Sequence, residues 1–468
     1  MPTTQQPRTP SDVASLSIAE ASALLRSGRI SALDLTRDAL ERAARLNPAT
    51  RWFITLDAEG ALAQAQRAEI EIRRGEHRGP LHGIPISLKD NIDTEGLRTT
   101  AGSAILKDRV PAADSFVAAR LRECGAILIG KTNLHEFAYG ITSVNPHFGT
   151  VANPWRPGHI AGGSSGGSAA SLAAGIGFAS VGTDTGGSIR IPASFCGVAG
   201  LKPGFDRISV AGTIPLAKSF DHVGPLARRI ADVAYLFDAL TSRRGVFDEG
   251  QGSLEGVRIG WPVSFYLDLI SDSVRKLLED AASCLAALGA ELHEVKLEQL
   301  DEAVQAATNV QLTEAAAWHR SRGYFPALAE QYGEDVRRLL EMGNSVSAAS
   351  LAGVPALKQR VRASFDEAFQ SVDALLTPAT PSAAPQIGAT ELSFGDRREA
   401  LRPAIMRLQR PTNFTGHPSL AVPCGFTPER LPVGLQLIGP HDSELHLLRI
   451  AHCYEQANTW RRLAEDTV

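Results

Sequence analysis

The sequence predicts an α/β protein with a parallel sheet and helical crossover connections. Short apolar segments alternate with longer segments of helical periodicity along most of the 468 residues. An apolar segment at 84–89, a helical segment at 114–124 and an apolar segment at 126–130 follow one another, which is the order of a parallel crossover. Apolar residues make up 44% of the chain and charged residues 21%, so a sizeable core can be buried.

The N-terminal region supplies helices before the first strand. Residues 1–14 are polar and contain Pro7 and Pro10, so we expect them to be disordered. Ser17 and Ser31 are each followed three residues later by an acidic residue, the signature of a capping box at a helix N-terminus. We therefore expect helices over 17–28, 31–48 and 58–74.

The later elements continue the alternation. Further helices are expected over 168–175, 188–195, 230–240, 273–289 and 443–456. Further strands are expected over 178–182, 257–261, 291–295, 373–377, 420–424 and 433–438. Residues 299–370 have an almost wholly helical pattern, which predicts a cap or an insertion. The chain contains no internal repeat, and we expect a single domain over 1–468.

Composition excludes several classes of protein. The net charge is −4 and no run of Lys or Arg stands out, which argues against nucleic-acid binding. The five cysteines are scattered and lack CxxC spacing, which favours a reducing compartment over a disulfide framework. No apolar segment is long enough to span a bilayer, and the first residues lack the apolar core of a secretory signal. We expect a cytoplasmic protein without membrane or nucleic-acid partners; a homodimer is allowed.

Three local features carry chemistry. Lys89 ends the apolar strand at 84–89, where a lysine normally faces solvent. Burial there would lower its pKa and let it serve as a neutral base. The segment 162–168 reads GGSSGGS, and 182–190 reads GTDTGGSIR between a predicted strand and a predicted helix. At such a junction, backbone N–H groups point in one direction and carry the positive end of the helix dipole.

The second Gly/Ser segment suits a nucleophile beside an oxyanion hole. The Ser188 hydroxyl could attack a carbonyl while backbone N–H groups donate to the developing oxyanion, the candidate donors being Thr185, Gly186, Gly187 and Ser188. The same cradle would also suit a phosphate or another small anion. A non-enzymatic anion-binding protein therefore stays open at this point.

Other catalytic arrangements have weaker support. None of the 12 histidines is singled out by its local sequence as a base. His135-Glu136 begins like a zinc-protease helix, but the second histidine of HExxH would fall at Tyr139, so we expect no metal. The stretch Gly162 to Gly166 fits G-x-S-x-G, which would make Ser164 the nucleophile of an α/β-hydrolase-type esterase. The residues from Arg156 onward do not form the strand that this motif requires.

Taken together, three motifs resemble the amidase signature family: Lys89-Asp90-Asn91, GGSSGGS at 162–168 and GTDTGGSIRIPASFCGVAGLKP at 182–203. The separations are 164 − 89 = 75 and 188 − 164 = 24, and both suit the Ser–Ser–Lys triad of that family. The resemblance runs from about residue 15 to 457, with the signature core at about 75–240. It implies a large mixed, mostly parallel central sheet that helices cover on both faces.

The resemblance also implies roles for individual residues. Ser188 would be the nucleophile, and Ser164, after a cis peptide bond from Gly163, would bridge it to the base Lys89. An acyl-enzyme would form and water would hydrolyse it, with no cofactor. Supporting roles in the loops fall on Ser165, Ser168, Asp184 and Arg190.

The sequence constrains the identity of the substrate less well than it constrains the catalytic residues. The family includes the glutaminase subunit of the tRNA-dependent amidotransferase, but the segments at 136–146 and 207–216 depart from that subunit, so we favour a stand-alone amidase. The pocket would be formed by 137–142 and by the helical region 310–345. Its expected lining suggests an apolar or aromatic amide, with aliphatic amides, carbamates and ureas also open; the residues are Ala138, Tyr139, Gly140, Ile141, Trp318 and Tyr324.

Overall fold

The computed structural model describes residues 13–241 and 252–458. The expected disorder of residues 1–14 falls mainly outside this range. Val13 and Ala14 are described, and both are buried, so the expectation does not hold for these two residues.

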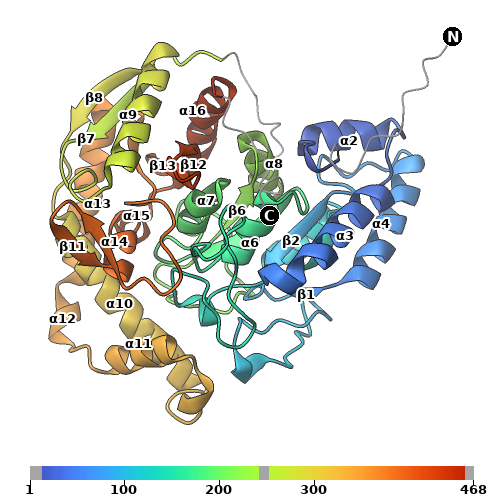
Figure 1. Cartoon of the computed structure of the whole chain (residues 1–468), viewed down its shortest axis with the longest axis horizontal. Coiled ribbons are helices and arrows are strands. Elements are labelled where there is room, and N and C mark those ends of the chain that lie inside the picture. The colour runs from blue at the N-terminus through green and yellow to red at the C-terminus, as the bar shows by residue number, and fades with distance from the viewer. Residues whose placement is uncertain (1–12, 242–251, 459–468) are drawn as a thin grey trace.

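One eleven-stranded mixed sheet runs through the molecule, in the order β1-β3-β2-β4-β6-β5-β12-β13-β9-β7-β8. Figure 1 shows β1 beside α3 and α4 on one side, and β7 and β8 at the opposite side. A separate two-stranded sheet joins β10 and β11. The strands are β1 (Phe53–Leu56), β2 (Pro85–Lys89), β3 (Ile127–Thr132), β4 (Ala179–Asp184), β5 (Ala199–Lys202), β6 (His222–Ala227), β7 (Arg258–Pro262), β8 (Glu291–Val295), β9 (Ala374–Pro378), β10 (Glu391–Phe394), β11 (Arg397–Ala400), β12 (Ser419–Phe426) and β13 (Pro432–Ile438).

The α/β class and the mixed sheet are confirmed, but the expected predominance of parallel pairing is wrong. The β3–β2–β4 and β9–β7–β8 groups are parallel. The other six of the ten pairings in this sheet are antiparallel. The sequence pattern did not identify strands β1, β5 and β6. Strands β1 and β5 are short, and β6 contains Gly224 and Pro225.

Helices flank this sheet. Strands β2, β3, β4, β6, β9 and β13 are buried at every position. Successive side chains of a strand face opposite sides, so these strands are covered on both faces. The helices are α2 (Ile18–Arg26), α3 (Ala32–Thr50), α4 (Ala58–Arg73), α5 (Phe116–Glu123), α6 (Gly166–Ala173), α7 (Arg190–Cys196), α8 (Ile230–Thr241), α9 (Asp272–Ala287), α10 (Leu300–Ser321), α11 (Glu334–Asn344), α12 (Ala349–Ala352), α13 (Val354–Ser371), α14 (Leu401–Arg407), α15 (Arg410–Thr415) and α16 (Glu444–Gln456), with short 3₁₀ turns η1 (Ala104–Leu106), η2 (Glu136–Ala138) and η3 (Ala329–Gln331).

The predicted helix starts are confirmed in detail. Ser17 and Ser31 both form capping boxes, with Glu20 and Asp34 respectively as the returning acidic residues. The segment expected to be helical, 299–370, contains α10 to α13. Its helices α10 and α13 both pack against α15, which lies outside the segment.

A single large cluster of buried apolar side chains extends from Val13 to Tyr454, so both halves of the chain share one core. Within the described ranges, no helix combines the length and the apolar character that a membrane span requires.

Candidate active site

Lys89 is the last residue of β2, and the sheet explains its burial. Strand β2 lies between its parallel neighbours β3 and β4, so the strand end is enclosed and Lys89 is 0% exposed. Its Nζ donates hydrogen bonds to Ser164 Oγ at 2.6 Å and to Thr183 Oγ1 at 2.8 Å. Burial lowers the pKa of Lys89 to about 7, although the carboxylates of Asp184 and Asp221 act in the opposite direction. A lysine with this pKa is neutral in a large fraction of molecules at physiological pH.

Ser164 lies at the turn that leads into α6. The Gly163–Ser164 peptide bond is cis, as the family resemblance implied. The Ser164 side chain is fully buried, and its hydroxyl accepts from Lys89. The next residue, Ser165, donates from its Oγ to the Thr183 carbonyl at 3.2 Å, which fastens this turn to the end of β4.

Ser188 follows β4 and lies two residues before the start of α7. Gly187 has φ of +113°, a backbone conformation that L side chains rarely adopt, and a Cβ there would lie 2.7 Å from Gln409 Cγ. The Ser165 N–H donates to the Ser188 carbonyl at 3.2 Å, so the two serine loops are joined through their backbones. Among the described residues the Ser188 hydroxyl makes no hydrogen bond, and the residue is 7% exposed.

The candidate oxyanion donors differ from one another. The Gly187 N–H donates to Asp184 Oδ1 at 2.8 Å, so this donor already has a partner. In the described part of the chain, the N–H groups of Thr185, Gly186 and Ser188 have no hydrogen-bond partner. We therefore remove Gly187 from the set of available donors. The sequence could not show this, because the loop curls back onto its own aspartate.

Asp184 and Arg190 form a fully buried ion pair beneath the Ser188 loop. Arg190 donates from Nε and Nη2 to the two carboxylate oxygens of Asp184, both at 3.0 Å. Burial raises the pKa of Asp184, but Arg190 and a hydrogen bond from Asn413 outweigh burial and hold that pKa well below its usual range. Asp184 also accepts the Ile189 N–H at 3.1 Å, so the ion pair anchors both sides of Ser188.

We predict that Arg190→Met lowers the free energy of unfolding by about 3–5 kcal/mol, because Asp184 would remain buried without its cation. Urea denaturation followed by circular dichroism measures the change. Lys276→Met is the matched control: its side chain and that of its partner Asp280 are 75% and 58% exposed. We expect that variant to lose less than about 1 kcal/mol. An equal loss in both variants would contradict a structural role for the buried pair.

The sequence did not single out two side chains at the site, those of Thr183 and Asp221. Thr183 receives the second hydrogen bond from Lys89, and Asn91 Nδ2 also donates to it at 3.3 Å. Asp221 accepts from Thr185 Oγ1 at 2.6 Å, and burial raises the pKa of Asp221 to about 6. Thr183 was within the quoted motif, so its position was a usable signal. Asp221 reaches the site only because β6 pairs with β4.

The expected pocket residues separate into two groups. Gly140 and Ile141 line an open, mainly apolar groove of about 750 Å³, together with Leu401 and Arg402. A Cβ on Gly163 would lie 2.9 Å from the Ile141 backbone carbon, so the groove wall abuts the Ser164 turn. Ala138 and Tyr139 are buried behind this wall.

Trp318 lies in an aromatic cluster with Phe137 and Tyr324. Its ring centroid is 6.2 Å from that of Phe137 and 6.0 Å from that of Tyr324. The cluster also includes the buried His319, whose Nδ1 lies 2.8 Å from Tyr332 Oη. Trp318 and Tyr324 are therefore not among the residues that line the groove.

The geometry does not favour a histidine base. The group 2.6 Å from Ser164 Oγ is a lysine, and no strand leads directly into Ser164 as an α/β-hydrolase elbow requires. His222, which flanks the site, is buried with its Nδ1 2.6 Å from the Phe220 carbonyl oxygen. Burial holds the pKa of His222 well below its usual value.

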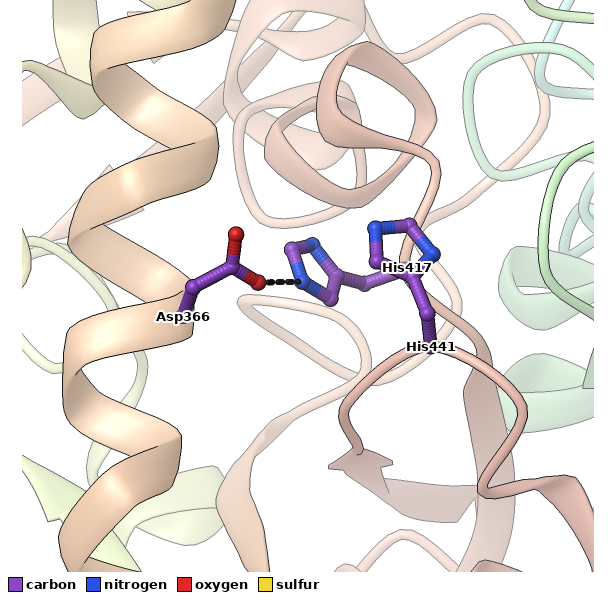
Figure 2. A group of neighbouring side chains, drawn as sticks. All are labelled: Asp366, His417 and His441. Carbon is purple, nitrogen blue, oxygen red and sulfur yellow. Dashed lines mark hydrogen bonds and ion pairs between the residues drawn. The ribbon is translucent and has the colours of Figure 1, made fainter.

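A second cluster of ligand-type side chains lies outside the triad. Asp366, His417 and His441 place one ligand atom each within 4.8 Å of one another. Figure 2 shows Asp366 extending from a helix toward His417, and their hydrogen bond is 3.3 Å long. The two imidazole rings stack at 4.2 Å. Burial and the charges of His441, Lys202 and Arg362 lower the pKa of His417. Stacked rings with Lys202 and Arg362 close to them fit a metal ion poorly, so we assign none.

Comparison with known proteins agrees with this geometry. Residues 34–448 match the family model described as Amidase. A glutamyl-tRNA(Gln) amidotransferase subunit from Synechococcus sp. (strain CC9605) is 38% identical over 474 residues, covering 92% of this chain and 94% of the relative. A crystal structure described as that of an amidase is 37% identical with a TM-score of 0.88, covering 95% of this chain and 100% of the other. The native peptide amidase of Stenotrophomonas maltophilia is 31% identical with a TM-score of 0.83, covering 96% and 98%.

Fold and site thus define a hydrolase that acts on carbon–nitrogen bonds. The chain belongs to the amidase signature family.

Proposed function

We propose that the protein is a stand-alone amidase in which Ser188 attacks a small carboxylic amide and Lys89 acts through Ser164. The observation that carries this proposal is the hydrogen bond of 2.6 Å between the buried Lys89 Nζ and Ser164 Oγ, next to the Ser188 loop. A lysine whose pKa is about 7 can accept a proton at neutral pH, which an exposed lysine cannot do efficiently.

The reaction has two half-reactions. The Ser188 Oγ forms a bond to the amide carbonyl carbon, and its proton passes through Ser164 to Lys89. The N–H groups of Thr185, Gly186 and Ser188, which have no partner among the described residues, donate to the oxyanion. The C–N bond then breaks, and the proton returns through Ser164 to the leaving amine. Water attacks the acyl-enzyme in the second half-reaction, which releases the acid and restores Ser188.

The hydrogen bond between Ser164 and Ser188 belongs to the substrate complex in this scheme. Catalytic hydrogen bonds are often long or poorly aligned in an empty site and tighten only when substrate binds. The backbone bond from Ser165 to Ser188 already holds the two loops together at 3.2 Å.

A second candidate function is the glutaminase subunit of a tRNA-dependent amidotransferase. The observation in its favour is the 38% identity to the amidotransferase subunit from Synechococcus sp. (strain CC9605) over nearly the whole chain. The stand-alone function is supported by the amidase structure with a TM-score of 0.88 at nearly the same identity, 37%. The segments at 136–146 and 207–216 also depart from the glutaminase pattern.

A turnover screen of the purified chain tests the proposal. We expect at least one class among anilides, aliphatic primary amides, carbamates and ureas to be hydrolysed without any partner protein, with Ser188→Ala as the blank. Glutamine is included as the probe for the second candidate. Hydrolysis of glutamine alone, and only after a partner protein is added, would favour the amidotransferase function. No hydrolysis of any amide, ester or carbamate would favour an anion-binding protein.

A further inference from the structure

Arg410, the first residue of α15, is a buried arginine that has no anionic partner in the described part of the chain. It is 4% exposed, and its Nη1 makes no hydrogen bond among the described residues. Its Nη2 has only the sulfur of Met406 as a partner, at 3.7 Å. Arg190 shows how the same interior satisfies a buried arginine, since Asp184, Asn413 and Gln436 all accept from it. Burying an unpaired cation is costly, so the Arg410 environment calls for an anion.

The surroundings of Arg410 add to its positive character. Arg402 lies with its Cζ 5.5 Å from the ring centroid of Tyr139. The charges of Arg402 and Arg410 both act to lower the pKa of Tyr139, so both guanidinium groups lie in its neighbourhood. Burial, and after it the charge of Arg402, lower the pKa of Arg410. The hydroxyl of Tyr139 is buried and has no hydrogen-bond partner in the described chain. Two arginines and an unpaired hydroxyl therefore lie in one neighbourhood, where the described residues supply no carboxylate to Arg410.

This group lies one side chain away from the oxyanion loop. A Cβ on Gly186 would lie 2.6 Å from Met406 Cε, and Met406 in turn contacts Arg410. Gln311, from α10, places its unpartnered Oε1 3.5 Å from the same point. A molecule held with its carbonyl at Gly186 would therefore have unsatisfied polar atoms of the protein close to its remaining part.

We propose that Arg410 and Tyr139 bind a carboxylate of the substrate, so that the preferred substrates are small amides that also carry a carboxylate group. A half-amide of a short dicarboxylic acid is the simplest member of this class. The inference rests on the proposed function, because that function places the reacting carbonyl beside Gly186. Arg410 would supply charge-assisted hydrogen bonds to the carboxylate, and the Tyr139 hydroxyl would donate a further one.

Two substrates of equal size test how the carboxylate charge affects kcat/KM. Succinamate and succinamide differ only in that one carboxylate is replaced by a neutral amide. We expect kcat/KM of the wild-type protein for succinamate to exceed that for succinamide by about 10- to 100-fold, the range of a charged hydrogen-bonded pair. Arg410→Gln should reduce this ratio to near one, and Arg410→Lys, which keeps the charge, should give an intermediate ratio. Arg398→Gln removes an arginine that is 76% exposed and should leave the ratio unchanged.

Ligand binding to the Ser188→Ala variant tests the carboxylate site separately from the proposed function, because binding needs no turnover. Calorimetry should show that Ser188→Ala binds succinate and succinamate more tightly than succinamide, and that adding Arg410→Gln removes the difference. Equal affinity for the three compounds, with hydrolysis of neutral amides intact, would overturn the carboxylate site alone. Tight binding of succinate with no hydrolysis of any amide would overturn the proposed function and leave the carboxylate site standing.

Thermal melts establish that each variant is folded. If Arg410→Gln does not fold, Arg410→Lys and Tyr139→Phe provide the comparison. A wild-type ratio of kcat/KM for succinamate to that for succinamide in both variants would overturn the inference.

Discussion

Ser188→Ala is expected to lower kcat/KM by about 10⁴- to 10⁶-fold, the largest effect of any single substitution in this protein. Alanine removes the only atom that forms the covalent bond to the substrate, so no acyl-enzyme can form. The residue is 7% exposed at the head of α7, so loss of one oxygen leaves the surrounding packing intact. Steady-state hydrolysis of the best substrate from the turnover screen measures the effect.

Ser171→Ala is a suitable control for this loss. Ser171 is another buried serine, on α6, and its Oγ donates only to the Ser168 carbonyl at 3.2 Å. We expect its activity to be near that of the wild type. Mass spectrometry of wild-type protein quenched during turnover should find the acyl group on the peptide that contains Ser188. Wild-type hydrolysis rates in Ser188→Ala, or an acyl group on Ser164, would show that Ser188 is not the nucleophile.

Lys89→Met is expected to lower kcat/KM by about 10²- to 10⁴-fold, the usual contribution of a general base. Methionine keeps most of the volume of the side chain but accepts no proton from Ser164.

The activity of the wild-type protein should increase as pH rises and level off above about pH 7, because Lys89 works as a base only after it loses its proton. The variant should lose this dependence. The measurement is kcat/KM between pH 5 and pH 9.

Stability distinguishes this loss from misfolding. The pKa of Lys89 is about 7 in the folded protein against 10.5 as its ordinary value, so the unfolded chain binds more protons between these two values. Stability contributed through this group therefore rises with pH over that window, and below it burial of the charged form is a cost. Lys89→Met removes that cost, so we expect its melting temperature at pH 7 to be no lower than that of the wild type. If Lys89→Met is inactive and also has a much lower melting temperature, its loss of activity reflects misfolding. Lys89→Gln is then measured at the same pH in its place. Full activity in either folded variant would contradict the Ser–Ser–Lys scheme.

The three residues of the proposed triad can be identified from the sequence because they lie in compact motifs at fixed spacing. Lys89 ends a strand that alternation alone identifies, and the glycines around Ser164 and Ser188 mark loops that must bend sharply. The structure then supplies what spacing cannot: Lys89 Nζ is 2.6 Å from Ser164 Oγ because β2 and β4 are neighbours in the sheet.

The pocket was harder to predict, because its walls come from segments that are distant in the chain. Gly140 and Ile141 line the groove, whereas the Trp318 ring packs against Phe137. Aromatic side chains on helices serve a core as readily as a binding site, and sequence does not separate the two. Arg410 drew attention only as part of a motif, since the lack of an anionic partner is visible only once its neighbours are known.

By itself, the sequence determined the α/β class, the capped N-terminal helices and the identity of the catalytic serine and lysine candidates. These depend on local periodicity, capping residues and short motifs, which are written in neighbouring residues. Only the tertiary structure decided the balance of parallel and antiparallel strands, the engagement of Gly187 by Asp184, and the burial of Arg410 without an anionic partner among the described residues. The pKa of Lys89 belongs to this second group as well. Each depends on burial and on contacts between residues far apart in the chain, and no local pattern encodes which distant side chain arrives.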